Sequence, residues 1–431
     1  MEILEKKEKF SQSLTFQAII VAVLMLLLLI PNAMIQSLIS ERQHQSYATI
    51  SEINAQWSLA QTVCPPVLVV PYTTTVVEKI GNKVQTKNVA HELFVAPENA
   101  EITVQLFPET RKRSIYKSIV YTSDIHISGD FSAAKNLKIE NSVLHFDKAY
   151  IVLLISDLRG LSQEIDFTIN GEKNPAKTDG RNMAIALNSK MLESENGFSF
   201  DCMLKLKGSS KISFVPVAKN TKVSISGDWS APEFIGDFLP EYSIDEKANN
   251  FKAKWNVLSF NRSIPEKWSD NSQYYLDESS FGVNLVDTVN HYQQNMRSAK
   301  YALMFIALTF VVFFFVEATT KRRIHPVQYS LVGIALVLFY SLLLSISEQI
   351  GFALAYLIAS SATISLITIY AAGIFKLKRA TAILATILVA LYTFLYVILQ
   401  LEDFALLMGS FALFFILGII MFVSRKIQWY K

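Results

Sequence analysis

Residues 327–346 read VQYSLVGIALVLFYSLLLSI, a stretch that contains no charged side chain. A helix needs about 20 mainly apolar residues to cross the hydrocarbon core of a bilayer. Lipid offers no hydrogen-bond partner to an open strand edge, so a stretch of this kind is predicted to cross as a helix. The chain is therefore predicted to be an integral membrane protein.

Five further apolar runs extend this prediction. The first runs from Leu14 to Ile30 and is closed by Pro31, although 33–39 can lengthen it. No pair of small residues with the spacing of a cleavage site follows this run, so we expect an anchor that stays attached. The predicted transmembrane helices are 14–39, 300–318, 327–346, 350–373, 380–400 and 404–423.

Positive charge is concentrated at one end of these helices. Basic clusters precede the first, separate the second from the third and the fourth from the fifth, and follow the sixth. The opposite turns, 347–349 and 402–403, contain no Lys or Arg. The positive-inside rule then predicts that the termini, 1–13 and 424–431, are cytoplasmic and that 40–299 is exported. The basic residues are Lys6, Lys7, Lys9, Lys321, Arg322, Arg323, Lys376, Lys378, Arg379, Arg425, Lys426 and Lys431.

The composition of 40–299 is that of an ordinary globular domain. The whole chain has 431 residues and only 18% charged residues, against about 25% in soluble domains, and the deficit lies after Lys300. A segment of this length can bury its own core without metals or disulfides. Ile50, Ile53 and Trp57 recur at helical spacing, which predicts a helical stalk to about residue 63, ended by Pro65-Pro66.

Beyond the stalk the pattern changes to period two, which is typical of half-buried strands. Apolar residues alternate with polar ones around 102–106, 202–206 and 223–226, and 150–155 is apolar throughout. Hairpin turns are predicted at 81–82, 170–171 and 208–210. The segment 127–133 is echoed at 225–231, which favours two similar β-sandwich-like units in tandem. The predicted fold is therefore six transmembrane helices plus a large extracytoplasmic β-rich domain.

Motifs that commit to a reaction are absent from the sequence. The six histidines do not form HExxH or another paired metal spacing, and no nucleophile elbow or phosphate-binding glycine loop occurs. The two cysteines, Cys64 and Cys202, are too few for a zinc site or a disulfide framework, and either a single bond or two buried thiols fits the pattern. We therefore expect no cofactor, no metal site and no enzymatic activity, and the small net charge of +3 argues against nucleic acid as a partner.

Charged residues avoid the cores of the six predicted helices and lie at their ends, where we expect water to reach them. This counts against a proton-coupled carrier, and the Ser and Thr of 350–373 are expected at helix contacts. Asp157-Leu158-Arg159-Gly160 could hold a buried ion pair, but a polar turn is favoured. The candidate constellation, either functional or made of helix caps and loop anchors, is Glu317, Arg323, His325, Gln328 and Glu348.

At the residues around this constellation the sequence resembles the CreD family of bacterial inner-membrane proteins. The resemblance is carried by 323–329 (RIHPVQY), by 338–345 (LFYSLLLS) and by 347–352 (SEQIGF), with further likeness at 229–234 (WSAPEF). The sequence departs from the family where Ser114 and Pro65 stand in place of glycine, which restricts two turns. The resemblance implies a role in cell-envelope integrity linked to an envelope-stress response, and it implies no catalytic residues.

The sequence and the resemblance together predict a non-enzymatic protein of the bacterial inner membrane that supports or monitors the envelope through its periplasmic domain. The alternative is a transporter, or a transporter subunit, for lipid or envelope material, which would need a polar cavity among the third to sixth helices. The expected partners are the lipid bilayer together with envelope proteins, peptidoglycan or lipid.

Overall fold

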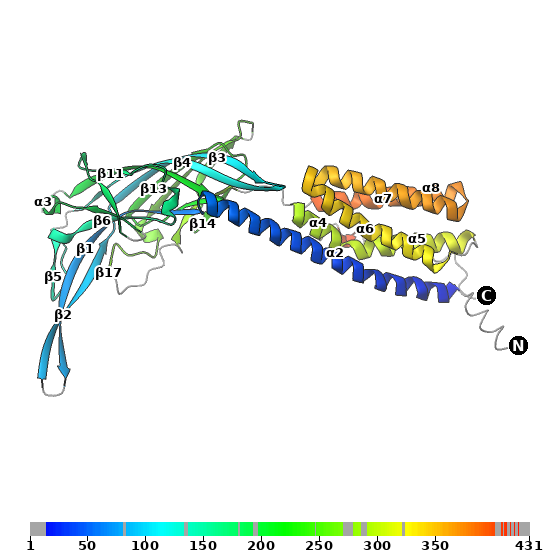
Figure 1. Ribbon diagram of the computed structural model, residues 1–431, viewed down its shortest axis with the longest axis horizontal. Coiled ribbons are helices and arrows are strands. Elements are labelled where there is room, and N and C mark those ends of the chain that lie inside the picture. Colours follow the sequence, from blue (N-terminus) through cyan, green and yellow to red (C-terminus); the bar gives the residue numbers. More distant parts are fainter. Residues whose placement is uncertain are drawn as a thin grey trace. The chain divides into compact units, whose positions relative to one another are not determined.

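A computed structural model of the chain describes residues 14–80, 83–132, 137–179, 182–192, 197–245, 247–269, 279–285, 291–320 and 324–400, with 407, 409–411, 414, 418 and 421. The chain forms two compact units (Figure 1). A helical unit combines Met1–Tyr47 with Val289–Lys431, and a β-rich unit comprises Ala48–Thr288.

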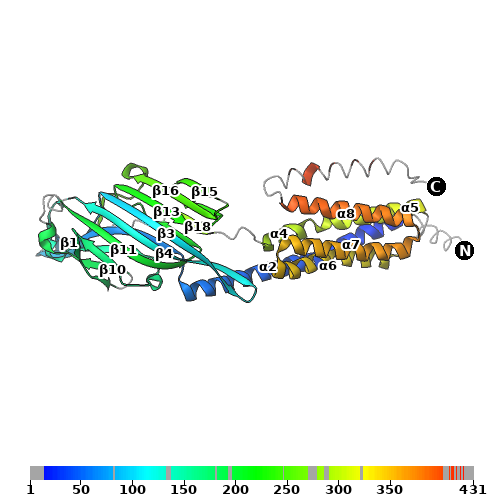
Figure 2. The ribbon, with the colours of Figure 1, turned by 90° about the horizontal axis from the view of Figure 1, so that it is seen from above.

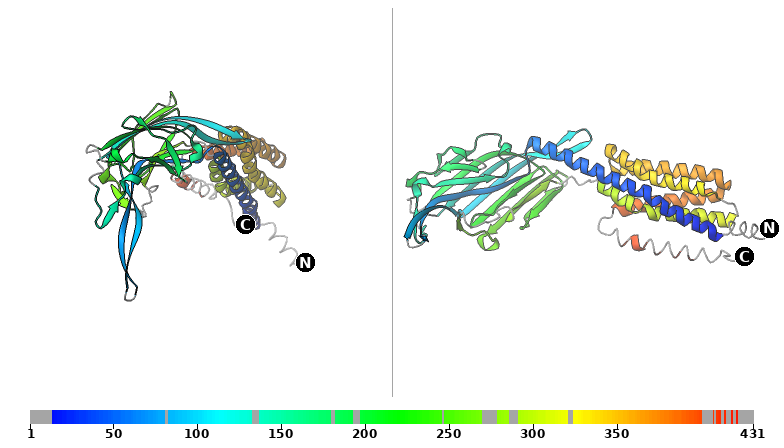
Figure 3. Two further views of the ribbon diagram at one scale, coloured as in Figure 1. Left: turned by 60° about the vertical axis from the view of Figure 1, so that its left-hand side comes forward. Right: turned by 60° about the horizontal axis from the view of Figure 1, so that its bottom comes forward.

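The helical unit is a bundle of long apolar helices, which Figure 3 shows lying side by side. Four helices of the described residues are long and apolar enough to cross a membrane, namely α2, α6, α7 and α8, and α4 with α5 makes a fifth if this pair, bent by 44°, is one span. The predicted sixth helix, 404–423, lies almost wholly outside the described residues. The helices are α2 (Leu14–Trp57), α4 (His291–Lys300), α5 (Ala302–Thr320), α6 (Pro326–Ile350), α7 (Phe352–Phe375) and α8 (Lys378–Gln400).

Aromatic side chains fill the core of the bundle. Phe339 of α6 meets the rings of Tyr356 on α7 and Tyr392 on α8 nearly edge to face, at centroid distances of 5.6 and 4.8 Å. Edge-to-face contacts of this kind stabilise packing beyond the area that they bury. On α6, Gly333 leaves room for Leu28 of α2, because a Cβ at position 333 would overlap the Leu28 side chain. Small residues allow close helix approach inside membranes in the same way.

Helix α2 differs from the predicted helix in two places, at Pro31 and at its C-terminal end. Pro31 lies inside the helix, and membrane helices tolerate such a proline when neighbouring groups satisfy the freed carbonyl. The helix ends at Trp57 instead of about residue 63. Pro65 and Pro66 lie in strand β1 (Gln61–Ile80), where the register with β6 shifts between Cys64 and Val67. A proline, which cannot donate to a ladder, is tolerated at such an irregularity.

The β-rich unit is built from two sheets. One sheet of the described residues has 10 strands and the other has 8; Figure 2 shows β15, β16, β13, β3, β4 and β11 of the second lying side by side. The β1–β2 hairpin extends beyond the rest of this unit (Figure 1).

The strands of the first sheet are β1 (Gln61–Ile80), β2 (Lys83–Val95), β5 (Ser142–Leu144), β6 (Tyr150–Ile155), β9 (Ala176–Asp179), β10 (Asn182–Ala186), β12 (Lys211–Phe214), β14 (Pro232–Gly236), β17 (Lys267–Ser269) and β18 (Phe281–Leu285). The strands of the second are β3 (Asn99–Arg113), β4 (Tyr116–Phe131), β7 (Asp166–Ile169), β8 (Glu172–Lys173), β11 (Phe198–Ser209), β13 (Asn220–Gly227), β15 (Glu241–Asp245) and β16 (Asn250–Leu258). A short helix, α3 (Ser189–Leu192), precedes β11, and single turns of 3-10 helix occupy Phe146–Lys148, Leu158–Gly160 and Ser259–Asn261.

Both sheets share one core, so the prediction of two sandwich-like units in tandem is wrong. Val70 and Ile151 of the first sheet belong to the same buried cluster as Val104 and Leu204 of the second. The echoed segments at 127–133 and 225–231 begin within the last residues of β4 and β13, which lie on either side of β3 in one sheet. Their likeness therefore reflects two similar strand ends rather than two domains. The predicted period-two burial is confirmed in β3, β11 and β13.

The predicted turns have different outcomes. Asn170-Gly171 joins β7 to β8 with φ values of 49° and 82°, as predicted for a tight hairpin. Residues 208–210 do not form a hairpin, because Ser210, with φ of 61°, passes the chain from β11 in one sheet to β12 in the other. The turn at 81–82 lies outside the described residues. Cys64 and Cys202 are both buried thiols.

Candidate functional site

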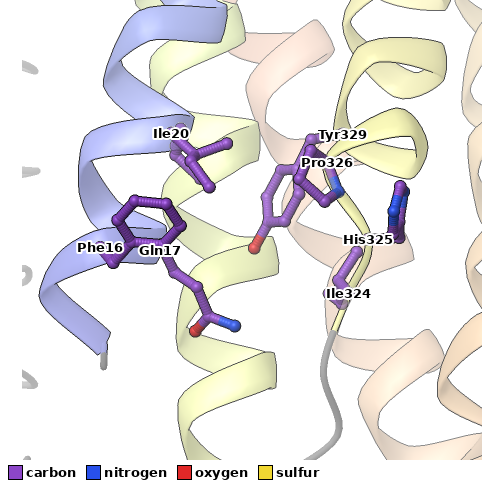
Figure 4. A pocket seen from close by; sticks show the side chains of 8 residues that line it. Phe16, Gln17, Ile20, Ile324, His325, Pro326 and Tyr329 are labelled. Atoms are coloured by element: carbon purple, nitrogen blue, oxygen red, sulfur yellow. The ribbon is translucent and has the colours of Figure 1, made fainter. Parts of the chain in front are cut away.

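A pocket of about 320 Å³ lies between the N-terminal turns of α2 and the start of α6, within the helical unit. In Figure 4 the phenol of Tyr329 occupies the space between the two helices, facing Phe16 and Gln17. The walls are mainly apolar, and the polar groups are the Gln17 amide, the His325 imidazole and the Tyr329 hydroxyl. The lining residues are Phe16, Gln17, Ile20, Val21, Ile324, His325, Pro326 and Tyr329.

Glu317, in the last turns of α5, contacts the lining residue Tyr329. It is buried, with 4% of its surface exposed. The hydroxyl of Tyr329 donates to its Oε2 at 2.9 Å, and the backbone N–H of Ile324 donates to its Oε1 at 3.2 Å. We expected water to reach this carboxylate, and that expectation is wrong. Burying a carboxylate costs free energy unless the group accepts hydrogen bonds, and these two donors provide such bonds here.

His325 and Gln328 cap helix α6. His325 is the N-cap residue, and its Nδ1 accepts from the N–H of Val327 at 3.3 Å. In return the Gln328 Oε1 accepts from the N–H of His325 at 3.0 Å. Pro326 occupies the first helical position, where a missing N–H costs nothing. The capping alternative of the sequence analysis therefore describes these two residues, and their arrangement is a capping box.

The predicted constellation does not form one cluster. His325 and Gln328 form the cap of α6, and Glu317 accepts from their neighbours Ile324 and Tyr329, whereas Glu348 lies near the other end of that helix. There the hydroxyl of Tyr292, on α4, donates to the Glu348 Oε1 at 3.1 Å. Arg323 lies outside the described residues. Sequence reasoning missed Tyr329 as a partner of Glu317, although its place one turn inside α6 is a usable signal.

A second cavity, of about 420 Å³, lies between α7 and α8. Its lining includes the hydroxyl-bearing side chains Ser360, Ser361, Thr393 and three tyrosines. The hydroxyl of Tyr356 donates to the backbone carbonyl of Tyr392 at 2.7 Å and ties the two helices together. The expectation that the Ser and Thr of this helix lie at helix contacts describes Thr363, which is buried, but Ser361 is exposed.

A buried polar network lies in the β-rich unit where α2 ends. Asp157, 8% exposed, accepts hydrogen bonds from the Ser58 hydroxyl at 3.1 Å and from the N–H of Leu59 at 3.0 Å. Arg159 forms a bidentate ion pair with the Asp157 carboxylate, in which Nε donates to Oδ1 and Nη2 donates to Oδ2, both at 2.9 Å. Gln61, fully buried, donates to the Ser58 hydroxyl and to the backbone carbonyl of Asp157. The carboxyl therefore fastens the end of α2 to the turn after β6.

The favoured interpretation of Asp157–Gly160 as a polar turn was incomplete. The segment does form a turn of 3-10 helix, with Asp157 as its N-cap, but it also contains the ion pair. The hydrogen bonds from the Arg159 side chain are the main reason that the pKa of the Asp157 carboxyl lies well below its usual range, and burial opposes them. The sequence analysis missed two partners of Asp157, namely Ser58, which precedes β1, and Gln61, the first residue of that strand.

Trp57 completes the attachment of α2 to the β-rich unit. Its indole N–H donates to the backbone carbonyl of Tyr121 at 3.4 Å. The guanidinium of Arg111 and the ammonium of Lys207 lie 4.6 and 4.9 Å from its ring centroid. Such cation–π contacts contribute about 0.5–1 kcal/mol each at exposed sites. Among the residues described, no group of three His, Cys, Asp or Glu side chains is placed to hold a metal ion.

Comparison with solved structures adds no functional information. An M1 zinc metallopeptidase from Deinococcus radiodurans, as a point mutant, matches with a TM-score of 0.19 and 6% identity over 38% of each chain. The enzyme without that mutation matches with a TM-score of 0.18 and 6% identity, over 38% of each chain. Likenesses this weak carry no argument about fold or chemistry.

Comparison with known sequences is decisive. The family model described as inner membrane protein CreD matches residues 13–430. The inner membrane protein CreD of Escherichia coli is 30% identical over 412 residues, which cover 94% of this chain and 91% of the relative. Apolar helices long enough to cross a membrane agree with that description. The chain belongs to the CreD family of inner membrane proteins.

Proposed function

We propose that this inner-membrane protein supports or monitors the integrity of the cell envelope through its β-rich unit and catalyses no reaction of its own. In this proposal the β-rich unit is periplasmic and both termini are cytoplasmic. The one-sided distribution of Lys and Arg in the sequence supports that orientation. The candidate partners of the β-rich unit are envelope proteins and peptidoglycan.

The observation that carries the proposal is the continuity of α2. This helix has 44 residues, whereas about 20 suffice to cross the hydrocarbon core. Its last turns are fastened to the β-rich unit by the buried network of Asp157 and by the Trp57 contacts. Its first turns line the pocket beside Tyr329. A force or ligand acting on the β-rich unit therefore has a direct covalent and helical route to the α2 end that the charge pattern assigns to the cytoplasm.

An insertion into α2 tests this route. Four glycines placed after the exposed His44 break the helix, since each glycine costs about 1 kcal/mol relative to alanine. Four alanines at the same place lengthen the helix equally but keep it continuous. In a strain lacking the gene, we expect the alanine variant to restore survival under detergent and cell-wall stress and the glycine variant to fail at equal abundance. Equal restoration by both variants would contradict the proposal.

The cavity between α7 and α8 favours a second candidate function, a transporter or transporter subunit for lipid or envelope material. Its hydroxyl groups and its size suit a polar group carried between helices. Crosslinking in intact membranes followed by mass spectrometry separates the two functions. Reproducible capture of a protein or of peptidoglycan by the β-rich unit favours the monitoring role, and captured lipid favours transport.

A further inference from the structure

The pocket between α2 and α6 has the lining of a lipid site. Five of its residues, Phe16, Ile20, Val21, Ile324 and Pro326, present apolar carbon, while Gln17, His325 and Tyr329 add an amide, an imidazole and a hydroxyl. Figure 4 shows the Gln17 amide and the Tyr329 hydroxyl directed toward the same end of the pocket. The Glu317 carboxylate is not part of the lining, because it is buried and accepts hydrogen bonds from Ile324 and Tyr329.

The helices that form this pocket face the bilayer. On α2, Ile19 and Val23 are 52% and 49% exposed, and on α6, Val327 and Leu331 are 57% and 49% exposed. Only 17% of the most apolar window of α2 is buried inside the protein, compared with 56% for α6. An apolar space between helices that both face hydrocarbon is filled by an acyl chain rather than by water.

In the sequence, the segments that precede the pocket-lining residues carry charge of one sign. The three residues that precede Ile324 are Lys321, Arg322 and Arg323, and Lys6, Lys7 and Lys9 precede α2. Each basic residue beside a membrane attracts anionic lipid by about 1 kcal/mol. The charge therefore selects a negatively charged headgroup for the lipid whose chain enters the pocket.

We propose that the pocket between α2 and α6 binds one anionic phospholipid. One acyl chain lies against Ile20, Val21 and Pro326, and the glycerol and phosphate lie at the end marked by Gln17, whose amide N–H groups can donate to the phosphate. The bound lipid packs between α2 and the rest of the bundle, and it stays in place instead of being transported. This site is independent of what the β-rich unit contacts.

Photolabelling of the complete protein tests the proposal. The chain is placed in nanodiscs of phosphatidylcholine that contain a small fraction of either phosphatidylglycerol or phosphatidylcholine with a diazirine on one acyl chain. After illumination, mass spectrometry locates the adducts. We expect adducts on peptides that contain 16–21 and 324–329, at least about fivefold more abundant with phosphatidylglycerol.

Two variants of neighbouring residues supply the control. Ile20→Trp fills the pocket, whereas Ile19→Trp places the same ring on the exposed face of the same helix. Labelling at 324–329 should fall several-fold in Ile20→Trp and stay unchanged in Ile19→Trp. Equal labelling by the two lipids on the unaltered chain, unchanged labelling in Ile20→Trp, or a second copy of the chain crosslinked at this face in place of lipid would each overturn the proposal.

Discussion

The hydroxyl of Tyr329 lies 2.9 Å from Oε2 of Glu317 and donates a hydrogen bond to it across the interface of α5 and α6. The phenol ring is itself held between Phe310 and Phe313, at centroid distances of 5.5 and 6.0 Å. The Glu317 carboxylate, near the end of the apolar helix α5, thus accepts a hydrogen bond from a donor on the next helix, α6. This pair links α5 to α6, whose start forms one wall of the pocket.

Removing either partner should loosen this end of the bundle. We expect Tyr329→Phe and Glu317→Gln each to destabilise the helical unit by about 1–2 kcal/mol, since a buried group loses a hydrogen bond to a charged partner. The measurement is reversible unfolding of the purified protein in mixed micelles. Neither variant should alter membrane insertion.

A double-mutant cycle decides whether the two residues act together. The combined variant should cost clearly less than the sum of the single variants, because they share one interaction. Additive effects would show that the pair is not energetically coupled. If Glu317→Gln abolished envelope protection at normal abundance and stability, the carboxylate would have a direct functional role instead of this structural one.

The sequence predicted which residues matter around Glu317 better than it predicted which group donates to the Glu317 carboxylate. Glu317, His325 and Gln328 were singled out; His325 and Gln328 cap α6, and Glu317 accepts from the N–H of Ile324, which precedes that cap. The predicted cation for Glu317, Arg323, lies outside the described residues, and the Tyr329 hydroxyl, which does donate to the carboxylate, was not predicted. Apolar periodicity marks Tyr329 as part of a buried face, but it cannot reveal which hydroxyl on that face finds a polar partner.

The β-rich unit shows a similar limit. Alternation identified β3, β11 and β13 correctly, because side chains on opposite faces of a strand meet different solvents. Alternation does not specify which strands pair, so β13 beside β3 in a parallel register could not be foreseen. The local echo at 127–133 and 225–231 was therefore mistaken for a domain repeat. Asp157 of the Asp157–Arg159 ion pair also contacts Ser58 and Leu59, which are distant in the sequence. The local sequence could not reveal these contacts either.

Acid should weaken the β-rich unit through Asp157. The folded-state pKa of this carboxyl is lowered below its ordinary value of about 3.9. Its stabilising contribution is thus complete above about pH 4 and is lost as the pH falls through the folded pKa. Asp157→Asn should cost about 1–3 kcal/mol at neutral pH, since buried donors lose their charged acceptor, and should flatten the acid dependence. Tryptophan fluorescence during thermal unfolding at pH 7 and pH 3 measures both effects, and an unchanged acid dependence in the variant would contradict this assignment.

Replacing Ser114 by glycine should stabilise the hairpin of β3 and β4. Ser114 has φ of 57° in the turn between these strands, a conformation that costs a non-glycine residue about 1 kcal/mol. The midpoint of thermal unfolding should rise in Ser114→Gly. As a matched control, Gly171 has φ of 82° with open space around its Cβ position, so Gly171→Ser should lower the midpoint by a similar amount. A fall in both variants would show that the Ser114 side chain contributes more than its backbone strain costs.

Thiol labelling in intact cells tests the account's central claim, that the β-rich unit faces the periplasm and both termini face the cytoplasm. The native thiols do not interfere, because Cys64 and Cys202 are buried and burial raises the pKa of Cys202 to about 12. Cysteines placed at Ser40, Gln349 and Asp403 should react with a membrane-impermeant maleimide added outside. Cysteines placed at Lys7, Arg322 and Lys378 should react only after the cells are lysed. Labelling at position 322 from outside, with protection at position 40, would reverse the orientation and contradict the proposed role at the envelope.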